Sequence, residues 1–288
     1  MGKKKILLLG ATGMAGHLAY YYLTETTKYD IIDVVFRHKL TPNSVTLDVT
    51  DKTATEDLIK SVNPDIIVNC IGILIKGSQQ HPDNAVYINA YFPHLLERVA
   101  CEIDAKLIHI STDCVFSGKK GNYAETDFRD ADDVYGRSKA LGEVINNKDL
   151  TIRTSIIGPE LKYNGEGLFH WFMQQNGEIK GFTQAIWGGV TTLELAKAID
   201  TAISNDLTGL IHLTNGESIN KYNLLHLFKE IWNKEDIEIL PIEGKKVDKS
   251  LMKSSQFNFN VPSYKVMLLE LKRWMGRYKQ IYQNIYQF

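Results

Sequence analysis

The fold of this chain is decided by Lys5-Ile6-Leu7-Leu8-Leu9-Gly10-Ala11-Thr12-Gly13-Met14-Ala15-Gly16, a short apolar strand that runs into three evenly spaced glycines. The residues that follow predict a helix over 17–22. A strand, a glycine turn and a helix in this order let an anion approach bare backbone at a helix N-terminus. The alternative is an ordinary strand-to-helix turn, but the flanking strand and helix favour a dinucleotide-binding βα unit.

Composition limits the class of protein. The chain has 288 residues, of which 44% are hydrophobic and 23% charged, enough for one large α/β domain with a smaller companion. The formal net charge of −1 predicts no binding to nucleic acid or to an anionic membrane. The longest apolar stretch, residues 66–75, is too short to span a bilayer. Three cysteines without metal-type spacing predict reduced thiols, a cytoplasmic location and no metal site.

Hydrophobic runs and turn residues divide the rest of the chain into further elements. The sequence predicts additional strands over 31–36, 45–51, 65–72, 106–114, 151–159 and 209–213. It predicts helices over 53–61, 89–100, 135–145, 192–204, 222–232, 263–274 and 278–288. Pro93 indicates that the regular part of the helix over 89–100 starts near that residue. This order predicts an α/β fold with a Rossmann-type, doubly wound parallel sheet and a smaller C-terminal α-rich substrate lobe. We assign 1–157 and 186–214 to the NAD(P)-binding Rossmann domain, and 158–185 and 215–288 to the lobe.

The end of the second strand is expected to select the cofactor. An acidic residue there would accept from the ribose 2′-hydroxyl of NAD, whereas a cation would accommodate the 2′-phosphate of NADP. Asp33 lies too early in the strand, while Arg37 lies just beyond it, so NADP(H) is favoured over NAD(H). Asp48 is a candidate for the adenine amino group, with helix capping by Asp48 or Thr50 as the alternative.

Polar side chains end the predicted fifth strand, where ligands bind in open α/β sheets. Thr112 and Asp113 occupy this strand end, whereas His109 falls earlier and is expected to be a satisfied core histidine. Tyr135 and Lys139 follow at i and i+4 on one helical face. A neighbouring ammonium stabilises a phenolate, so we expect Lys139 to lower the pKa of Tyr135 and also to hold the nicotinamide ribose.

These residues resemble the extended short-chain dehydrogenase/reductase superfamily over nearly the whole chain. The motifs are Gly10-x-x-Gly13-x-x-Gly16, Ser111-Thr112-Asp113, Tyr135-x-x-x-Lys139 and Arg153-Thr154-Ser155. Within that superfamily, residues 111–118 and 135–143 are most similar to the dTDP-4-dehydrorhamnose reductase family. The resemblance implies an NADPH-dependent reductase of a nucleoside-diphosphate 4-keto-6-deoxy sugar in surface-polysaccharide synthesis. It also implies that Thr112 binds the C4 carbonyl, Tyr135 protonates its oxygen and Lys139 supports both.

The expected site residues fall into three groups. The catalytic residues are Thr112, Tyr135 and Lys139. The cofactor-binding residues are Gly10, Thr12, Gly13, Met14, Gly16, Arg37, Asp48, Val49, Cys70, Ile71, Gly72, Tyr135 and Lys139. The substrate-binding residues are Thr112, Asp113, Ser155 and Trp187. A homodimer is left open.

Other functions of the same superfamily stay open. A 4,6-dehydratase would need an Asp-Glu pair after the threonine, but the second position here is Cys114. A nucleotide-sugar epimerase would need an extra acid and base, for which Cys114 is a candidate, although a packed apolar thiol is the favoured interpretation. The family also includes the non-catalytic partner of methionine adenosyltransferase, so an NADP-binding regulatory subunit is a third alternative. The run Gly188-Gly189-Val190-Thr191-Thr192 and Ile156 after Ser155 depart from the rhamnose enzymes, which leaves open another 4-keto sugar nucleotide.

Overall fold

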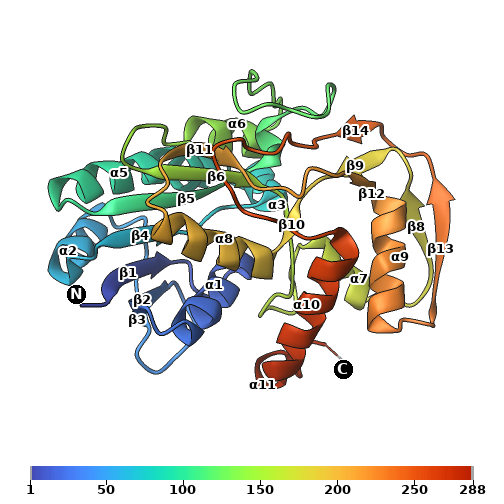
Figure 1. Cartoon of the computed structure of the whole chain (residues 1–288), viewed down its shortest axis with the longest axis horizontal. Coiled ribbons are helices and arrows are strands. Elements are labelled where there is room, and N and C mark those ends of the chain that lie inside the picture. The colour runs from blue at the N-terminus through green and yellow to red at the C-terminus, as the bar shows by residue number, and fades with distance from the viewer. Residues whose placement is uncertain (1, 287–288) are drawn as a thin grey trace.

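A seven-stranded parallel sheet forms the centre of the computed structural model, which describes residues 2–286 (Figure 1). In spatial order its strands are β11 (Gly209–His212), β6 (Leu150–Thr154), β5 (Lys106–Thr112), β4 (Ile66–Asn69), β1 (Lys4–Leu9), β2 (Tyr29–Val35) and β3 (Val45–Thr46). The chain winds outward from β1 to β3, then crosses back to β4 and winds the other way. The predicted doubly wound sheet is therefore confirmed, and its order reverses between β1 and β4.

Alternate residues of β1 face two separate cores. Ile6 and Leu8 pack with α1 (Met14–Glu25) and α8 (Thr192–Ser204), whereas Leu7 and Leu9 pack with α2 (Lys52–Val62) and α5 (Phe92–Glu102). Figure 1 shows these helix pairs on opposite faces of the sheet. All four strand residues are fully buried. A strand covered on both faces must be apolar throughout, which explains the unbroken run before the first glycine.

The glycine turn joins β1 to α1 as predicted. Gly10 has a φ of 81°, in the left-handed region, and its N–H donates to the carbonyl oxygen of Val34 at 3.0 Å. Gly13 donates in turn to the Gly10 carbonyl oxygen at 2.9 Å. A Cβ atom at Gly16 would lie 2.2 Å from that same oxygen, so helix and turn approach more closely than any side chain allows.

The helix expected over 89–100 becomes regular at Phe92, next to Pro93, as predicted, and the stretch before it is irregular. The segment after β4 forms α3 (Ile75–Gln80), α4 (Pro82–Ala85) and a π-helical stretch, η1 (Val86–Tyr91), before α5 begins. Pro93 would crowd the Asn89 carbonyl in a regular α-helix. In the wider π turn that oxygen instead lies against Gly142, where a Cβ would come within 1.9 Å of it. The proline and a tertiary contact together explain the irregular helix.

β3 and α6 are among the elements that are shorter than predicted. β3 ends at Thr46 because the Asp48 side chain accepts from the backbone N–H of Thr50 at 3.0 Å and bends the chain. Asp51, and neither Asp48 nor Thr50, caps α2 by accepting from Ala54 N–H at 3.0 Å. α6 (Val134–Leu141), capped by Asp133, stops before residue 145. Its end at Gly142 turns the Glu143 side chain into the core.

The remaining elements lie beside the main sheet (Figure 1). They include η2 (Asp113–Val115), β7 (Ile156–Ile157), α7 (Leu168–Met173), β8 (Gly177–Phe182), β9 (Ala185–Trp187), β10 (Val190–Thr191), β12 (Ile219–Asn220), α9 (Lys221–Trp232), β13 (Ile237–Ile242), β14 (Val247–Asp248), α10 (Tyr264–Arg277) and α11 (Lys279–Tyr282). Three small sheets, β10-β7, β12-β9-β14 and β13-β8, accompany the expected helices.

The end of the chain differs from the continuous helix expected over 278–288. α11 is only four residues long, and residues 287–288 of that expected helix lie outside the described part of the chain. Throughout residues 2–286, every helix falls short of the length and apolar character that a bilayer crossing requires.

Candidate active site

A cavity of about 580 Å³ lies at the carboxyl ends of β1, β4 and β5, beside the point where the strand order reverses. Its lining brings together residues from the glycine turn, the ends of β4 and β5, and α6. Eleven of the residues predicted for the site line it: Thr12, Gly13, Met14, Cys70, Ile71, Gly72, Thr112, Asp113, Tyr135, Lys139 and Ser155. Segments that are more than a hundred residues apart in sequence thus meet around one space.

Six predicted site residues lie outside this lining. Gly10 and Gly16 lie behind it and shape the turn. Arg37 and Asp48 are exposed beyond β2 and β3, and the Arg37 guanidinium lies over the Phe36 ring at 4.7 Å from its centroid. Val49 and Trp187 are buried and lie outside the lining of the cavity. The Trp187 indole N–H donates to Ser155 Oγ at 2.9 Å, so it holds a lining residue in place.

The end of β5 presents a hydroxyl and a carboxylate to the cavity. Thr112 Oγ1 donates to Asp113 Oδ1 at 3.1 Å and accepts from the backbone N–H of Cys114 at 3.1 Å, which fixes its orientation. Burial raises the pKa of the Asp113 carboxyl, although the Lys249 ammonium and nearby hydroxyls oppose the rise. Burial likewise raises the pKa of the Cys114 thiol to about 12, and Asp113 adds to it. The thiol is therefore uncharged at neutral pH.

Tyr135 faces this strand end from the first turn of α6. The Asp133 side chain caps the helix by accepting from Gly136 N–H at 2.8 Å. Burial raises the pKa of the Tyr135 phenol above its usual value, the neighbouring Cys114 thiol adds to the rise, and a hydrogen bond with Thr112 opposes it. The sequence predicts a lowered pKa for Tyr135. This prediction is wrong because burial of the phenol sets the direction of the shift. In the structure Tyr135 is a neutral acid with a proton to donate.

Lys139 lies one turn further along α6 and is 4% exposed. Its Nζ donates to the Ile110 carbonyl oxygen at 2.8 Å and lies 3.3 Å from His109 Nε2. Burial lowers the pKa of Lys139 to about 8, with the Glu143 carboxylate opposing the shift. His109 is fully buried and its Nδ1 is 3.1 Å from Asn69 Nδ2, so the predicted satisfied core histidine is confirmed.

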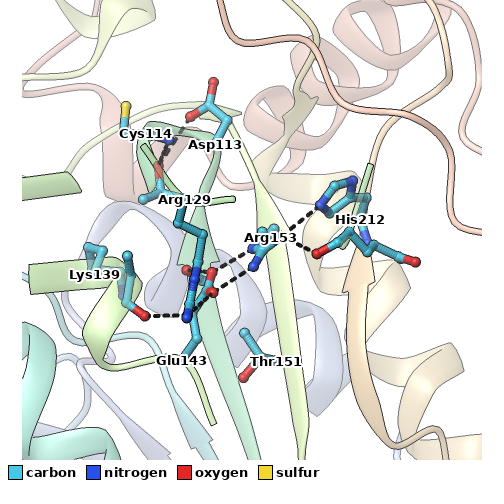
Figure 2. A network of polar contacts seen from close by, with 12 residues as sticks. Asp113, Cys114, Arg129, Lys139, Glu143, Thr151, Arg153 and His212 are labelled. Atoms are coloured by element: carbon cyan, nitrogen blue, oxygen red, sulfur yellow. Dashed lines mark hydrogen bonds and ion pairs between the residues drawn. The ribbon is translucent and has the colours of Figure 1, made fainter. Parts of the chain in front are cut away.

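A buried ion-pair network holds β5, α6 and β6 together next to the cavity (Figure 2). Glu143 accepts from Arg153 at 2.6 and 2.7 Å, from Arg129 at 3.0 Å and from the Ser111 hydroxyl at 2.8 Å. Arg153 also donates to the Glu125 carbonyl oxygen at 3.1 Å. Every oxygen of this carboxylate is thus paired, as burial of a charge requires. The network fixes the strand end that carries Thr112.

Sequence reasoning missed two parts of the cavity lining, residues 73–75 and 77 after β4 and a loop on another wall. The loop between β7 and α7 contributes Glu160, Lys162, Asn164, Glu166 and Gly167. Glu160 is 9% exposed and accepts from the Gly167 N–H at 2.6 Å, which folds the loop back on itself. The close spacing of Gly165 and Gly167 after an acidic residue is the only local signal of this fold, because a Cβ at either glycine would come within 3 Å of the Glu160 carboxylate.

Comparisons with known proteins agree with this geometry. The family model described as the RmlD substrate binding domain matches residues 4–287. A dTDP-4-dehydrorhamnose reductase from Aggregatibacter actinomycetemcomitans is 29% identical over 157 residues, 52% of this chain and 51% of that protein. The chain therefore spans about half the length of this curated relative.

Two further relatives are matched over more of their length. The β subunit of methionine adenosyltransferase 2 from Bos taurus is 24% identical over 261 residues, 83% of this chain and 75% of that one. A solved structure, dTDP-4-dehydrorhamnose reductase from Bacillus anthracis str. Ames in complex with NADP, is 23% identical and superimposes with a TM-score of 0.80. That match covers 96% of this chain and 100% of the other, and it shows a shared fold.

Proposed function

This chain belongs to the family of the RmlD substrate binding domain, and from that membership we propose that it is an NADPH-dependent reductase of a nucleoside-diphosphate 4-keto-6-deoxy sugar. One observation carries the proposal: Thr112, Tyr135 and Lys139 line the same cavity as the glycine turn. A hydroxyl, a neutral phenol and an amine beside a dinucleotide-binding turn are the groups that carbonyl reduction needs. We place the enzyme in the cytoplasm, in deoxysugar and surface-polysaccharide synthesis.

The residues of the glycine turn fit a dinucleotide. A Cβ would collide with backbone at Gly16, and the first N–H groups of α1 have no acceptor within the helix, so the turn leaves bare donors for a pyrophosphate. Thr12, Gly13 and Met14 would hold that group, while Cys70, Ile71 and Gly72 at the end of β4 would flank the rest of the cofactor. Bound there, NADPH supplies the hydride.

The side chains of β5 and α6 would complete the reduction. In this structure the Thr112 hydroxyl gives its one hydrogen to Asp113 Oδ1 and accepts from Cys114 N–H, so it would bind the C4 carbonyl oxygen by turning that hydrogen toward the substrate. Tyr135, kept neutral by burial, would give its proton to that oxygen as negative charge develops on it. Lys139 would hold the nicotinamide ribose. Asp113 and Ser155 would contact the sugar, with Trp187 supporting Ser155 from behind.

Preference for NADPH rests on Arg37, which is exposed two residues beyond β2. A guanidinium binds phosphate with several donors at once, whereas NADH offers only hydroxyls there. We assign 158–185 and 215–288 to the substrate lobe, since the loop with Glu160 lines the cavity and the Lys249 ammonium acts on Asp113 and Cys114 at its edge.

A regulatory subunit is the second candidate, because the methionine adenosyltransferase β subunit is matched over 75% of its length and 83% of this chain. Such a protein would bind NADP without turning it over. The presence of Thr112, Tyr135 and Lys139 in one cavity favours the enzyme.

The deciding experiment measures NADPH oxidation with dTDP-, UDP-, GDP- and CDP-linked 4-keto-6-deoxy sugars. We expect turnover with at least one of them, and a kcat lower by about 10²-fold or more in Tyr135→Phe with NADPH binding retained. Unchanged turnover in Tyr135→Phe would refute the assigned proton donor. Tight NADPH binding with no oxidation of any substrate would favour the regulatory subunit.

A further inference from the structure

Two tyrosines near the end of the described chain are connected by hydrogen bonds, through histidines, to two walls of the cavity. Tyr282 and Tyr286 lie four residues apart, with 0% and 3% of their surfaces exposed. Each hydroxyl is hydrogen-bonded to a buried histidine, and each histidine contacts a different cavity wall. The two rings also meet their histidines edge to face, at centroid distances of 5.8 and 5.6 Å.

The first pair reaches the glycine turn. His17 Nδ1 lies 2.7 Å from the Gly13 carbonyl oxygen, and its Nε2 lies 2.9 Å from the Tyr282 hydroxyl. A carbonyl oxygen only accepts, so Nδ1 carries the hydrogen. Burial lowers the pKa of His17 to about 4, which keeps the ring neutral, and Nε2 therefore accepts from Tyr282. The Gly13 carbonyl thus fixes the tautomer, and the Tyr282 hydroxyl supplies the donor that the remaining nitrogen needs.

The second pair reaches the opposite wall, the loop between β7 and α7. His170 Nε2 lies 3.1 Å from the Tyr163 carbonyl oxygen and must donate to it, and its Nδ1 lies 2.7 Å from the Tyr286 hydroxyl. The Tyr286 hydroxyl also accepts from the backbone N–H of Glu160 at 2.8 Å. Both contacts of this hydroxyl hold the loop that Glu160 closes on Gly167.

We propose that Tyr282 and Tyr286 are positioning residues. They hold the glycine turn and the 158–167 loop in fixed positions relative to each other, and so set the affinity of the cavity for its nicotinamide dinucleotide. The inference rests on the proposed function for the identity of the ligand. The clamp, meaning Tyr282 and Tyr286 with their histidines, rests on three hydrogen bonds between residues 265, 116 and 126 positions apart and on two local contacts, at Gly13 and Tyr163. Tyr282, Tyr286, His17 and His170 lie outside the lining of the cavity, so we expect the clamp to act on cofactor binding and to leave the chemical step unchanged.

The variant Tyr282→Phe removes one hydroxyl and keeps the ring. It leaves His17 Nε2 buried without its donor, so the tautomer that binds Gly13 loses its stabilisation. The Kd for NADPH should rise by about fivefold, with kcat at saturating NADPH within about twofold of wild type. Tyr286→Phe should act in the same direction through the other wall.

Tyr278→Phe is the matched control. Tyr278 belongs to the same segment and also contacts α1, but its hydroxyl donates to Glu25 Oε1 at 2.6 Å, at the far end of the helix from the glycine turn. Its NADPH Kd should stay within about twofold of wild type. In a double-mutant cycle, His17→Leu combined with Tyr282→Phe should weaken NADPH binding no more than His17→Leu alone, since both changes break one chain of contacts.

Hydrogen exchange tests the clamp without any ligand. In Tyr282→Phe, amides of residues 12–18 should exchange faster than in Tyr278→Phe, and in Tyr286→Phe amides of residues 158–168 should do so. Equal exchange and equal NADPH Kd in Tyr282→Phe and Tyr278→Phe would overturn the inference. If the wild-type protein binds neither NADPH nor NADP while the exchange difference is present, the proposed function fails and the clamp stands.

Discussion

Lys139 Nζ lies 3.3 Å from His109 Nε2, at the inner end of a buried chain that begins at Asn69. The Asn69 side-chain oxygen accepts from the Ile71 N–H at 3.0 Å, so its Nδ2 faces His109 Nδ1 and donates to it. In the neutral ring Nε2 then carries the hydrogen and points at Lys139. A protonated Lys139 would face the His109 N–H with its own N–H groups, whereas an unprotonated Lys139 could accept a hydrogen bond from His109. The geometry and the burial of Lys139 both favour loss of its proton.

The pH dependence of reduction should reflect this environment. Burial lowers the pKa of Lys139 to about 8, so the ammonium prevails below that pH and the amine above it. If the ammonium holds the cofactor ribose, kcat/KM falls as pH rises through about 8, by up to about tenfold per pH unit. Initial rates between pH 6 and 10 measure this limb. Lys139→Arg, whose side chain stays charged, should be slower but lack the limb. A wild-type profile that stays flat to pH 10 contradicts the role of the ammonium.

Arg37 should discriminate between the two nicotinamide cofactors. Its guanidinium is exposed and packs on the Phe36 ring, so Arg37→Ala removes a phosphate-binding group without opening the core. We expect the Kd for NADPH to rise about tenfold and that for NADH to change less than about twofold. Fluorescence titration of both cofactors measures this. Lys39→Ala is the matched control, because it removes one positive charge from the same loop, where Lys39 Nζ donates to the Pro42 carbonyl oxygen. Equal losses for NADPH and NADH in Arg37→Ala would remove the proposed preference.

Glu143 should be more important for stability than any exposed ion pair. Glu143→Gln keeps the shape of the side chain but leaves the buried Arg153 guanidinium without its counter-charge, which costs about 3–5 kcal/mol. Urea unfolding measures this loss. Glu102→Gln, which breaks exposed pairs with Lys60 and Arg98, should change stability far less. A similar midpoint for the two variants would show that the buried network is not the stronger one. Because Glu143 also accepts from Ser111, kcat of the folded Glu143→Gln protein should fall as well.

The features that were predicted correctly from the sequence depend on residues that are close together in the chain. The turn from β1 to α1 follows from glycines three residues apart, and the shared face of Tyr135 and Lys139 follows from helical spacing. Partners far along the chain decided the rest. The Glu160 loop closes the cavity through Tyr286, which lies 126 residues away. Lys139 turns toward His109, thirty residues earlier on β5, so its effect on Tyr135 could not be judged from their spacing alone.

The same limit explains why the predicted end of α6 was wrong. α6 stops at Leu141 because Gly142 must pass within contact of the Asn89 carbonyl oxygen and because Glu143 then turns inward to Arg153. The helical periodicity of residues 135–145 indicates neither partner. The start of α5 at Phe92 could be predicted, in contrast, because its signal, Pro93, is local.

Gly16 and Gly276 provide the most direct test of the cofactor turn, because both are helical glycines with opposite surroundings. A Cβ at Gly16 would lie 2.2 Å from the Gly10 carbonyl oxygen and 3.1 Å from Ala11 Cα, and these backbone atoms cannot yield without moving the turn. Gly16→Ala should therefore destabilise the protein by about 2 kcal/mol or more and weaken NADPH binding at least about tenfold.

A Cβ at Gly276 in α10 would meet nothing within 4 Å. Gly276→Ala should instead stabilise the protein by about 0.5–1 kcal/mol, since alanine loses less backbone entropy in a helix, and leave NADPH binding unchanged. If α1 packs against the turn as described, urea unfolding should show that the two variants change stability in opposite directions. NADPH titration should show weaker binding for Gly16→Ala alone. A Gly16→Ala protein as stable as Gly276→Ala, with wild-type NADPH affinity, would mean that the close approach of α1 to Gly10 is not what shapes the cofactor site.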